Sequence, residues 1–145
     1  MMDKKCINVL LVDDDDVAAE GVMRSLKKHN VDYTLVHAED GQEALDIIRK
    51  KHPDKSITRP FLTLLDLNMP RMNGFEFLST IRADPALQEL VVFVLTTSSA
   101  DADLNRAYQE SIAGYMVKSC VGPQFSKLVN LLQTYGDAVS LPVRH

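Results

Sequence analysis

Five short runs of apolar, mostly branched residues recur along the chain, and each is followed by a segment with the apolar spacing of an amphipathic helix. The runs and their helical segments are 7–12 then 17–29, 33–37 then 42–51, 61–65 then 75–83, 91–95 then 101–111, and 114–117 then 124–135. Strands that are apolar throughout are typical of a parallel sheet covered by helices on both faces. The pattern therefore predicts an α/β, doubly wound fold with parallel strands.

The length of 145 residues and the mass of 16.2 kDa suit one domain. We expect a single domain over residues 1–145, with a core at about 7–135 and a C-terminal tail at 136–145. The connection at 50–59 is longer and more polar than the others, but neither it nor the tail could hold a second domain. A content of 46% hydrophobic and 25% charged residues is typical of globular proteins.

The net charge and the hydropathy of the chain limit which binding partners and which cellular compartment we expect for the protein. The formal net charge of −4 excludes the broad basic surface that grips nucleic acid. No apolar stretch approaches the ~18 residues of a membrane span. The first apolar run leads directly into four aspartates without a signal-peptide cleavage site. Cys6 and Cys120 are expected at opposite ends of parallel strands, too far apart for a disulfide. We therefore expect a cytoplasmic protein that binds neither nucleic acid nor membrane.

Polar residues that can bind ions or take part in reactions follow four of the predicted strands. The first run ends in Asp13–Asp16, the third in Asp66, the fourth in Thr96 and the fifth in Lys118. The carboxyl ends of parallel strands share one edge of the sheet, so these groups are expected to converge there. Several carboxylates placed together repel one another, and a hard divalent cation relieves that repulsion. The sequence therefore predicts an Mg²⁺ site.

The four consecutive aspartates cannot all have the same role. An aspartate at this position often caps the following helix and complements its dipole. We expect Asp16 to be that cap and Asp15 to be a solvated residue. The residues after Thr96 are expected to be ordinary turn residues.

These residues resemble the receiver domains of two-component response regulators from Val9 to about Leu132. The run from Leu10 through Asp14 resembles the acidic pair of that family, and 64–74 (LLDLNMPRMNG) resembles its phosphoacceptor strand and loop. The resemblance implies a flavodoxin-like sheet with strand order 2-1-3-4-5. The length, the extended connection at 50–59 and the Lys118-Ser119 pair further resemble the small regulators associated with bacterial phytochromes.

The resemblance implies a phosphorelay role for Asp66, which would accept a phosphoryl group from a phosphohistidine and become an aspartyl phosphate. Asp14 and Asp66 would bind Mg²⁺ directly together with the backbone carbonyl of Asn68. Asp13 would act mainly through metal-bound water. Thr96 would hold phosphoryl oxygens with its hydroxyl group.

Two further positions take their roles from the same resemblance. Lys118 would hold the phosphoryl oxygens, and Tyr115 would be the switch aromatic that responds when the Thr96 loop moves. The family usually has proline after the lysine, joined by a cis peptide, whereas this chain has Ser119. A cis bond before a non-proline residue costs about 3–4 kcal/mol, so we expect a trans bond, with Gly122-Pro123 making the turn. The Lys118 amine should still lie near Asp66.

The implied partners are a sensor histidine kinase, of the phytochrome type if the narrower resemblance holds, and a downstream protein target. A homodimer could form through the face made by 101–111, 114–117 and 124–135. The protein would be a phosphoprotein that signals by protein contact and loses its own phosphoryl group. It would not be a turnover enzyme.

Two alternatives stay open from the sequence. A haloacid-dehalogenase-like phosphatase would use Asp13 as nucleophile, since residues 13–17 fit its Asp-x-Asp-x-Thr/Val motif. That interpretation lacks a later acidic metal pair and a cap insertion, and it leaves Asp66 unused. A receiver that binds a partner without phosphorylation is the other alternative, although each position the chemistry requires carries a suitable residue.

Overall fold

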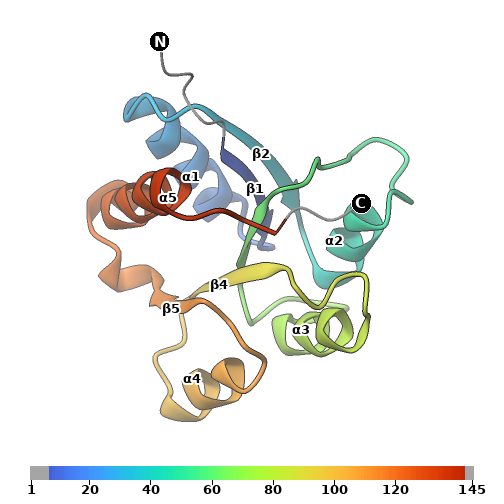
Figure 1. Cartoon of the computed structure of the whole chain (residues 1–145). Coiled ribbons are helices and arrows are strands. Elements are labelled where there is room, and N and C mark those ends of the chain that lie inside the picture. Colours follow the sequence, from blue (N-terminus) through green and yellow to red (C-terminus); the bar gives the residue numbers. More distant parts are fainter. Residues whose placement is uncertain (1–6, 143–145) are drawn as a thin grey trace.

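A parallel sheet of five strands runs through the centre of the protein, in the order β2-β1-β3-β4-β5 (Figure 1). The computed structural model describes residues 7–142. The strands are β1 (Ile7–Val12), β2 (Tyr33–Ala38), β3 (Leu62–Leu65), β4 (Val91–Thr96) and β5 (Gly114–Val117). This confirms the predicted doubly wound α/β class and the flavodoxin-like strand order.

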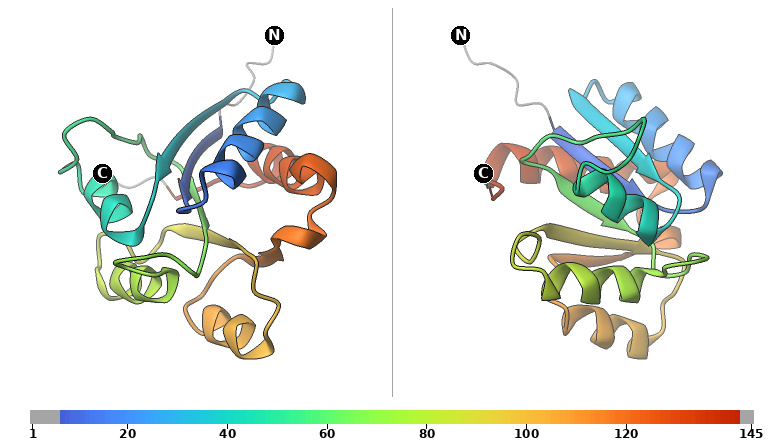
Figure 2. Two further views of the ribbon diagram at one scale, coloured as in Figure 1. Left: turned by 180° about the vertical axis from the view of Figure 1, so that it is seen from behind. Right: turned by 90° about the vertical axis from the view of Figure 1, so that its right-hand side faces the viewer.

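Helices cover both faces of this sheet. They are α1 (Asp16–Lys28), α2 (Gly41–Ile48), α3 (Gly74–Ala83), α4 (Asp101–Tyr108) and α5 (Ser126–Ala138). The helices α1 and α5 lie on one face, and α2, α3 and α4 on the other (Figure 2). Each face has its own hydrophobic core, because the side chains of a strand alternate between the two sides.

The burial of the strands follows their place in the sheet. All four residues of β3 are buried, and so is β4 after its first residue, whereas the edge strands β2 and β5 are mostly half-buried. The fully apolar runs of the sequence therefore correspond to central strands with helices above and below. This arrangement brings the carboxyl ends of β1, β3 and β4 to the middle of one sheet edge.

Helix ends account for most differences between expected and observed bounds. The helix predicted at 42–51 ends at Ile48, because Lys50 adopts a left-handed backbone conformation with φ 60°. The helix α5 continues to Ala138, and Leu141 packs against the core beside it. The beginning of the predicted tail at 136–145 is thus part of the packed structure.

The prediction that Asp16 caps α1 is wrong, because the N-cap is Asp15. Asp15, not Asp16, lies just before the helix in an extended conformation, and its carboxylate accepts hydrogen bonds from the N–H groups of Val17 and Ala18. Asp16 lies inside the first turn, where a negative charge complements the helix dipole.

The peptide bond between Lys118 and Ser119 is trans, as predicted; the cis bond that the structure records within residues 7–142 joins Arg59 and Pro60. After Lys118 the chain forms short 3₁₀ turns, and Gly122 adopts φ 84° in the turn that leads to α5.

Cys6 lies outside the described residues, so the expected absence of a disulfide is not tested. Within the described part, no helix combines the length and apolar character needed to span a bilayer.

Candidate acidic site at the carboxyl edge of the sheet

The residues predicted from four different strands meet at one edge of the sheet. Asp13 follows β1 and Asp66 follows β3, while Thr96 ends β4 and Lys118 follows β5. The N–H of Asp66 donates to Val12 O at 2.9 Å, which continues the strand pairing up to the acidic residue. The backbone ladder therefore fixes where Asp66 lies, as the parallel topology predicted.

Three carboxylates form a cluster at this edge. Asp13, Asp14 and Asp66 each offer an oxygen, and these oxygens lie within 4.8 Å of one another. Asp13 and Asp66 are 1% and 5% exposed, whereas Asp14 is exposed to solvent. Buried like charges at this separation repel strongly. Hard divalent cations prefer oxygen ligands, so this donor set fits Mg²⁺ or a similar ion.

Both carboxylate oxygens of Asp13 have a polar partner, whereas the carboxylate of Asp14 has none within residues 7–142. Asp13 Oδ1 accepts the N–H of Asp15 at 2.8 Å, and its Oδ2 lies 2.8 Å from Lys118 Nζ. Within residues 7–142, the carboxylate of Asp14 accepts no hydrogen bond and lines a shallow open depression with Asn68. Asp14 is thus the carboxylate that is free to bind a cation from solution.

Lys118 lies between the two buried carboxylates, with Nζ 2.8 Å from Asp13 Oδ2 and 3.5 Å from Asp66 Oδ2. Burial raises the pKa of Asp13, and the neighbouring charge of Asp66 acts in the same direction against the lowering effect of Lys118. Burial opposes the charge of Lys118, but the hydrogen bond and charge of Asp13 raise the pKa of its ammonium above the usual value. Lys118 therefore stays a cation that partly neutralises the cluster.

Asp66 accepts hydrogen bonds from the end of β4 and from its own loop. The hydroxyl of Thr96, which is fully buried, donates to Asp66 Oδ1 at 2.9 Å. The backbone N–H of Asn68 donates to the same oxygen at 3.3 Å. Hydroxyl and amide donors around one carboxylate can also bind the oxygens of a group attached to it.

The loop that carries Asn68 is held against neighbouring helices. A Cβ atom at Gly74 would lie only 2.5 Å from Asp66 O and 2.7 Å from Leu67 Cα, so only glycine allows α3 to begin this close to the acidic residue. On the other side, the N–H of Gly41 in α2 donates to Met72 O at 3.0 Å.

A chain of polar contacts leads from Asp66 to Tyr115. Thr96 Oγ1 accepts the N–H of Ser98 at 3.4 Å, and Ser98 O accepts the Tyr115 hydroxyl at 3.0 Å. Burial raises the pKa of the half-buried Tyr115 phenol. The hydroxyl of Ser98 also donates to Asp103 Oδ2 at 2.6 Å, which connects the loop to α4.

Three residues that contact the site or its loops are not predicted from the sequence: His37, Arg71 and Ser98. His37 Nε2 lies 2.6 Å from Asp13 O, and Arg71 Nε donates to the buried Asp40 at 2.7 Å. His37 is the penultimate residue of β2, so its place beside the residue after β1 could have been inferred from the strand order. Neither Arg71 nor Ser98 carries such a signal, because their contacts depend on loop conformation.

Comparisons with known proteins agree with this geometry. The family model of the response regulator receiver domain matches residues 9–132. The chain is 32% identical to the response regulator Rcp1 of Synechocystis sp. over 135 residues, which is 92% of each protein. It is 33% identical over 127 residues to a probable methanogenesis regulatory protein, FilR2, of Methanothrix harundinacea, covering 88% of this chain and 81% of that protein.

Solved structures show the same likeness. The Mn²⁺-bound form of Rcp1 superposes with a TM-score of 0.82 at 31% identity, covering 94% of this chain and 99% of that one. The phosphorylated cyanobacterial phytochrome response regulator RcpA gives 0.83 at 29% identity, covering 96% of this chain and 100% of that one.

Proposed function

The chain belongs to the response regulator receiver domain family of two-component signalling, and we propose that Asp66 is the residue on which it accepts the phosphoryl group. The observation that carries this proposal is the convergence of Thr96, Lys118 and two further carboxylates on the Asp66 side chain. Neither the phosphatase alternative nor the unphosphorylated receiver is favoured by the comparisons. The phosphatase alternative would also leave Asp66 without a role, although Thr96 and Lys118 both contact it.

The proposed reaction is an in-line transfer from a phosphohistidine. A carboxylate oxygen of Asp66 attacks phosphorus, a P–O bond forms, and the bond between phosphorus and the imidazole nitrogen breaks. The Thr96 hydroxyl and the Lys118 ammonium then donate to the phosphoryl oxygens. Since Thr96 also contacts Ser98, movement of Thr96 toward the phosphoryl group would be transmitted to Tyr115, which we propose as the switch aromatic.

We infer that Asp14, Asp66 and the backbone carbonyl of Asn68 hold Mg²⁺, with Asp13 acting through water. The bound cation would neutralise charge on the transferring phosphoryl group. The exposed, unengaged carboxylate of Asp14 and the engaged one of Asp13 support this division. Asp14→Ala should therefore cost more Mg²⁺ affinity than Asp13→Ala in a calorimetric titration, and equal losses would contradict the assignment.

Intact mass after incubation with Mg²⁺ and a small phosphodonor tests the acceptor. The mass should rise by one phosphoryl group, and Asp66→Asn should abolish the increase while the circular dichroism spectrum stays unchanged. Asp13→Asn serves as the matched variant and should still be phosphorylated. Loss of the increase in Asp13→Asn with retention in Asp66→Asn would overturn the proposal in favour of the phosphatase alternative.

The kinase partner is proposed to be a phytochrome-type histidine kinase. The support is the likeness to RcpA, which is described as a phytochrome response regulator. Transfer rates from an autophosphorylated phytochrome kinase and from an unrelated histidine kinase would test this choice. Faster transfer from the phytochrome kinase is expected, and a preference for the unrelated kinase would refute it.

A homodimer through α4, β5 and α5 is proposed as one output. Tyr108 of α4 and Leu131 of α5 are large apolar residues that are 49% and 36% exposed. Sedimentation before and after phosphorylation should show association that Leu131→Glu removes. A monomer in both states would exclude the dimer.

We further propose that the protein acts as a single cytoplasmic receiver domain that signals through protein contact. It would hydrolyse its own acyl phosphate slowly, as a signalling protein and not as a turnover enzyme. Removing the kinase and following the phosphorylated mass over time would test this. A mass that never decays would contradict self-hydrolysis.

A further inference from the structure

The longest connection between two elements of the described chain, residues 49–61, forms a groove with the end of α2. The groove has a volume of about 670 Å³. It is lined by Ile48, Arg49, Lys50, His52, Lys55, Ser56, Ile57, Thr58, Arg59 and Phe61. The loop extends beyond α2 at the β2 side of the molecule (Figure 1). None of these residues lines the depression at the acidic site, so this is a separate surface.

Positive charge is concentrated along this loop. Residues 49–59 contain five basic residues and one acidic residue in a chain with a net charge of −4. Arg49, Lys50, Lys55 and Arg59 all line the groove. Arg49 already pairs with Asp84 at 3.2 Å and Lys55 with Glu43 at 3.6 Å, whereas Lys50 is exposed and makes no ion pair within residues 7–142. A local excess of cations on an acidic protein favours an anionic occupant.

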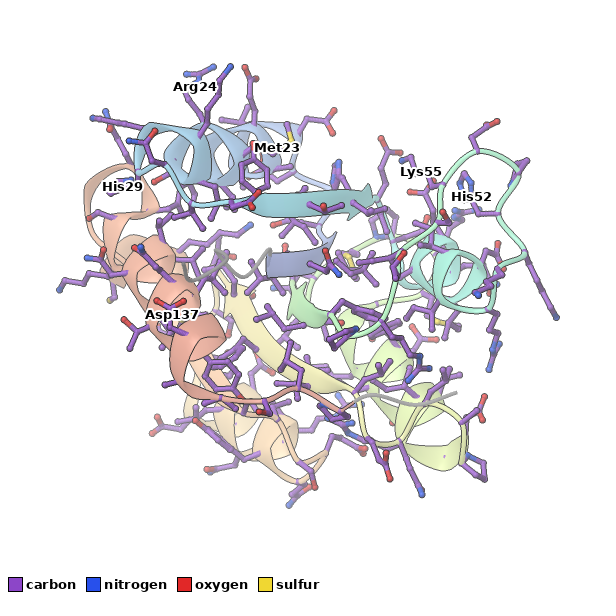
Figure 3. All side chains as sticks on the ribbon, turned by 45° about the horizontal axis from the view of Figure 1, so that its top comes forward. Met23, Arg24, His29, His52, Lys55 and Asp137 are labelled. Atoms are coloured by element: carbon purple, nitrogen blue, oxygen red, sulfur yellow. The ribbon has the colours of Figure 1, made fainter. Side chains whose placement is uncertain are left out.

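The loop has a fixed conformation because His52 organises it. His52 Nδ1 accepts the N–H groups of Asp54 and Lys55 at 3.0 and 2.9 Å, so the ring hydrogen is on Nε2, which donates to Glu43 Oε2 at 3.1 Å. Lys55 Nζ donates to His37 O at 2.8 Å. Figure 3 shows His52 and Lys55 on the inner side of this loop, beside α2.

The far end of the loop is also anchored. Asn8 Nδ2 donates to Thr58 O at 3.2 Å and to Pro60 O at 3.1 Å, and Arg59 donates to Ala86 O at 3.2 Å. The groove is therefore formed before any partner binds, which lowers the entropic cost of binding.

The groove combines this charged rim with an apolar floor. Ile48, Ile57 and Phe61 line it and are continuous with the core beneath α2. An occupant with both carboxylates and an apolar side chain would match both parts. A simple inorganic anion would leave the apolar floor unused.

The backbone geometry favours a peptide over a phosphate compound. The helix α2 meets the groove with its carboxyl end, so it does not offer there the N–H groups that bind phosphate at a helix start. The carbonyl groups of Leu45, Asp46 and Ile47 at this end already accept N–H groups of residues 49–52. The N–H groups of Ser56, Ile57 and Thr58 donate to no group among residues 7–142, and the loop there is not helical. An extended peptide could pair with them.

We propose that the groove between α2 and residues 49–61 is a docking site for an acidic segment of a partner protein, with an apolar side chain of that segment placed on Ile48, Ile57 and Phe61. The rim cations, above all Lys50, contact its carboxylates. This binding does not require phosphorylation of the acidic site.

A short fluorescein-labelled peptide of glutamates with one Leu and one Phe is a direct probe, measured by anisotropy on the full chain. The variant Lys50→Glu alters an exposed rim residue that makes no ion pair in the described structure. It should weaken binding at least about tenfold. Lys51→Glu is the matched control, because Lys51 is adjacent and exposed but does not line the groove. It should stay within about twofold of the wild type.

Two control peptides separate charge from apolar contact. Replacing Glu by Gln, or Leu and Phe by Ser, should each weaken binding, and amide chemical shifts should change within residues 49–61. Absence of binding at about 1 mM peptide, or equal weakening by Lys51→Glu, would overturn the proposal. Full displacement of the peptide by inorganic phosphate, or binding only to phosphatidylserine vesicles, would assign the groove to another ligand and equally overturn it.

Discussion

Lys118 Nζ lies 0.7 Å closer to the carboxylate of Asp13 than to that of Asp66, at 2.8 Å against 3.5 Å. The cation is therefore held mainly by the acidic residue that we do not propose as the acceptor. It can turn toward Asp66 without leaving the cluster when new negative charge develops there. Until then it is the internal counter-charge of two buried carboxylates.

Replacing Lys118 should leave the repulsion between the carboxylates of Asp13 and Asp66 uncompensated. Lys118→Met should lower the free energy of unfolding without metal by about 1–3 kcal/mol, because two buried carboxylates lose a charged partner. It should at the same time bind Mg²⁺ more tightly, since the cluster becomes more negative. Urea denaturation in EDTA and a calorimetric Mg²⁺ titration measure both effects. Lys127→Met, on an exposed site of α5, is the control. Unchanged stability would show that Lys118 does not balance the cluster.

The contact between Gly74 and Asp66 gives a second prediction. Gly74→Ala places a Cβ 2.5 Å from Asp66 O and 2.7 Å from Leu67 Cα, and neither backbone atom can move freely. We expect a loss of about 1–3 kcal/mol in unfolding free energy and slower phosphorylation by a small phosphodonor. Gly114→Ala is the comparison, because its Cβ would meet only ring carbons of Phe93, at 3.0 Å and beyond. Equal effects on phosphorylation from both variants would refute a specific role for Gly74.

Much of this architecture follows from local sequence signals. The bounds of β1 and β5 agree with the apolar runs at 7–12 and 114–117. Once the strands are parallel, Asp13, Asp66 and Thr96 must share one edge, so the site required no knowledge of loops. The prediction of the receiver family, made from the same residues, is confirmed by the family model.

The remaining features depend on backbone geometry that a sequence does not display. Asp15 and Asp16 have identical side chains, and the cap is decided by which of them is extended where the chain leaves the strand. Lys50 and Arg71 adopt a left-handed backbone conformation although they are not glycines, so no sequence signal marks the turns they make. The groove beside α2 depends on one of those turns.

Glu43 should make stability depend on pH on the acid side. Burial would raise its pKa, but hydrogen bonds from Glu39 N–H and His52, with the charge of Lys55, lower it below the ordinary value of 4.5. A carboxylate with a lowered folded pKa stabilises the fold above the unfolded value, and this contribution is lost as pH falls below about 4.5.

Melting temperatures of the wild type between pH 7 and pH 3 should therefore fall more steeply below pH 4.5 than those of Glu43→Gln. Glu20→Gln, an exposed pair partner of Arg24 on α1, leaves the contacts of the 49–61 loop intact and serves as control. Parallel curves for the wild type and Glu43→Gln would contradict this assignment.

The ion pair between Asp40 and Arg71 should control the loop that carries Asn68. Asp40 is buried, its Oδ1 caps α2 by accepting Glu43 N–H at 2.8 Å, and its Oδ2 accepts Arg71 Nε at 2.7 Å. Arg71→Ala should therefore leave α2 capped but free the loop, so that Mg²⁺ affinity and the rate of phosphorylation each fall by about two- to fivefold.

Asp40→Asn sharpens this last prediction, because asparagine keeps the oxygen that caps α2 but removes the charge that holds Arg71. It should reproduce the loss of Mg²⁺ affinity seen in Arg71→Ala, and the double variant should lose little more, since both changes break one contact. Arg24→Ala removes an ion pair whose two partners are both exposed, with Glu20 on α1, far from the loop, and should leave Mg²⁺ affinity unchanged. Additive losses in the double variant would mean that Asp40 and Arg71 act separately, and would contradict control of the loop by their ion pair.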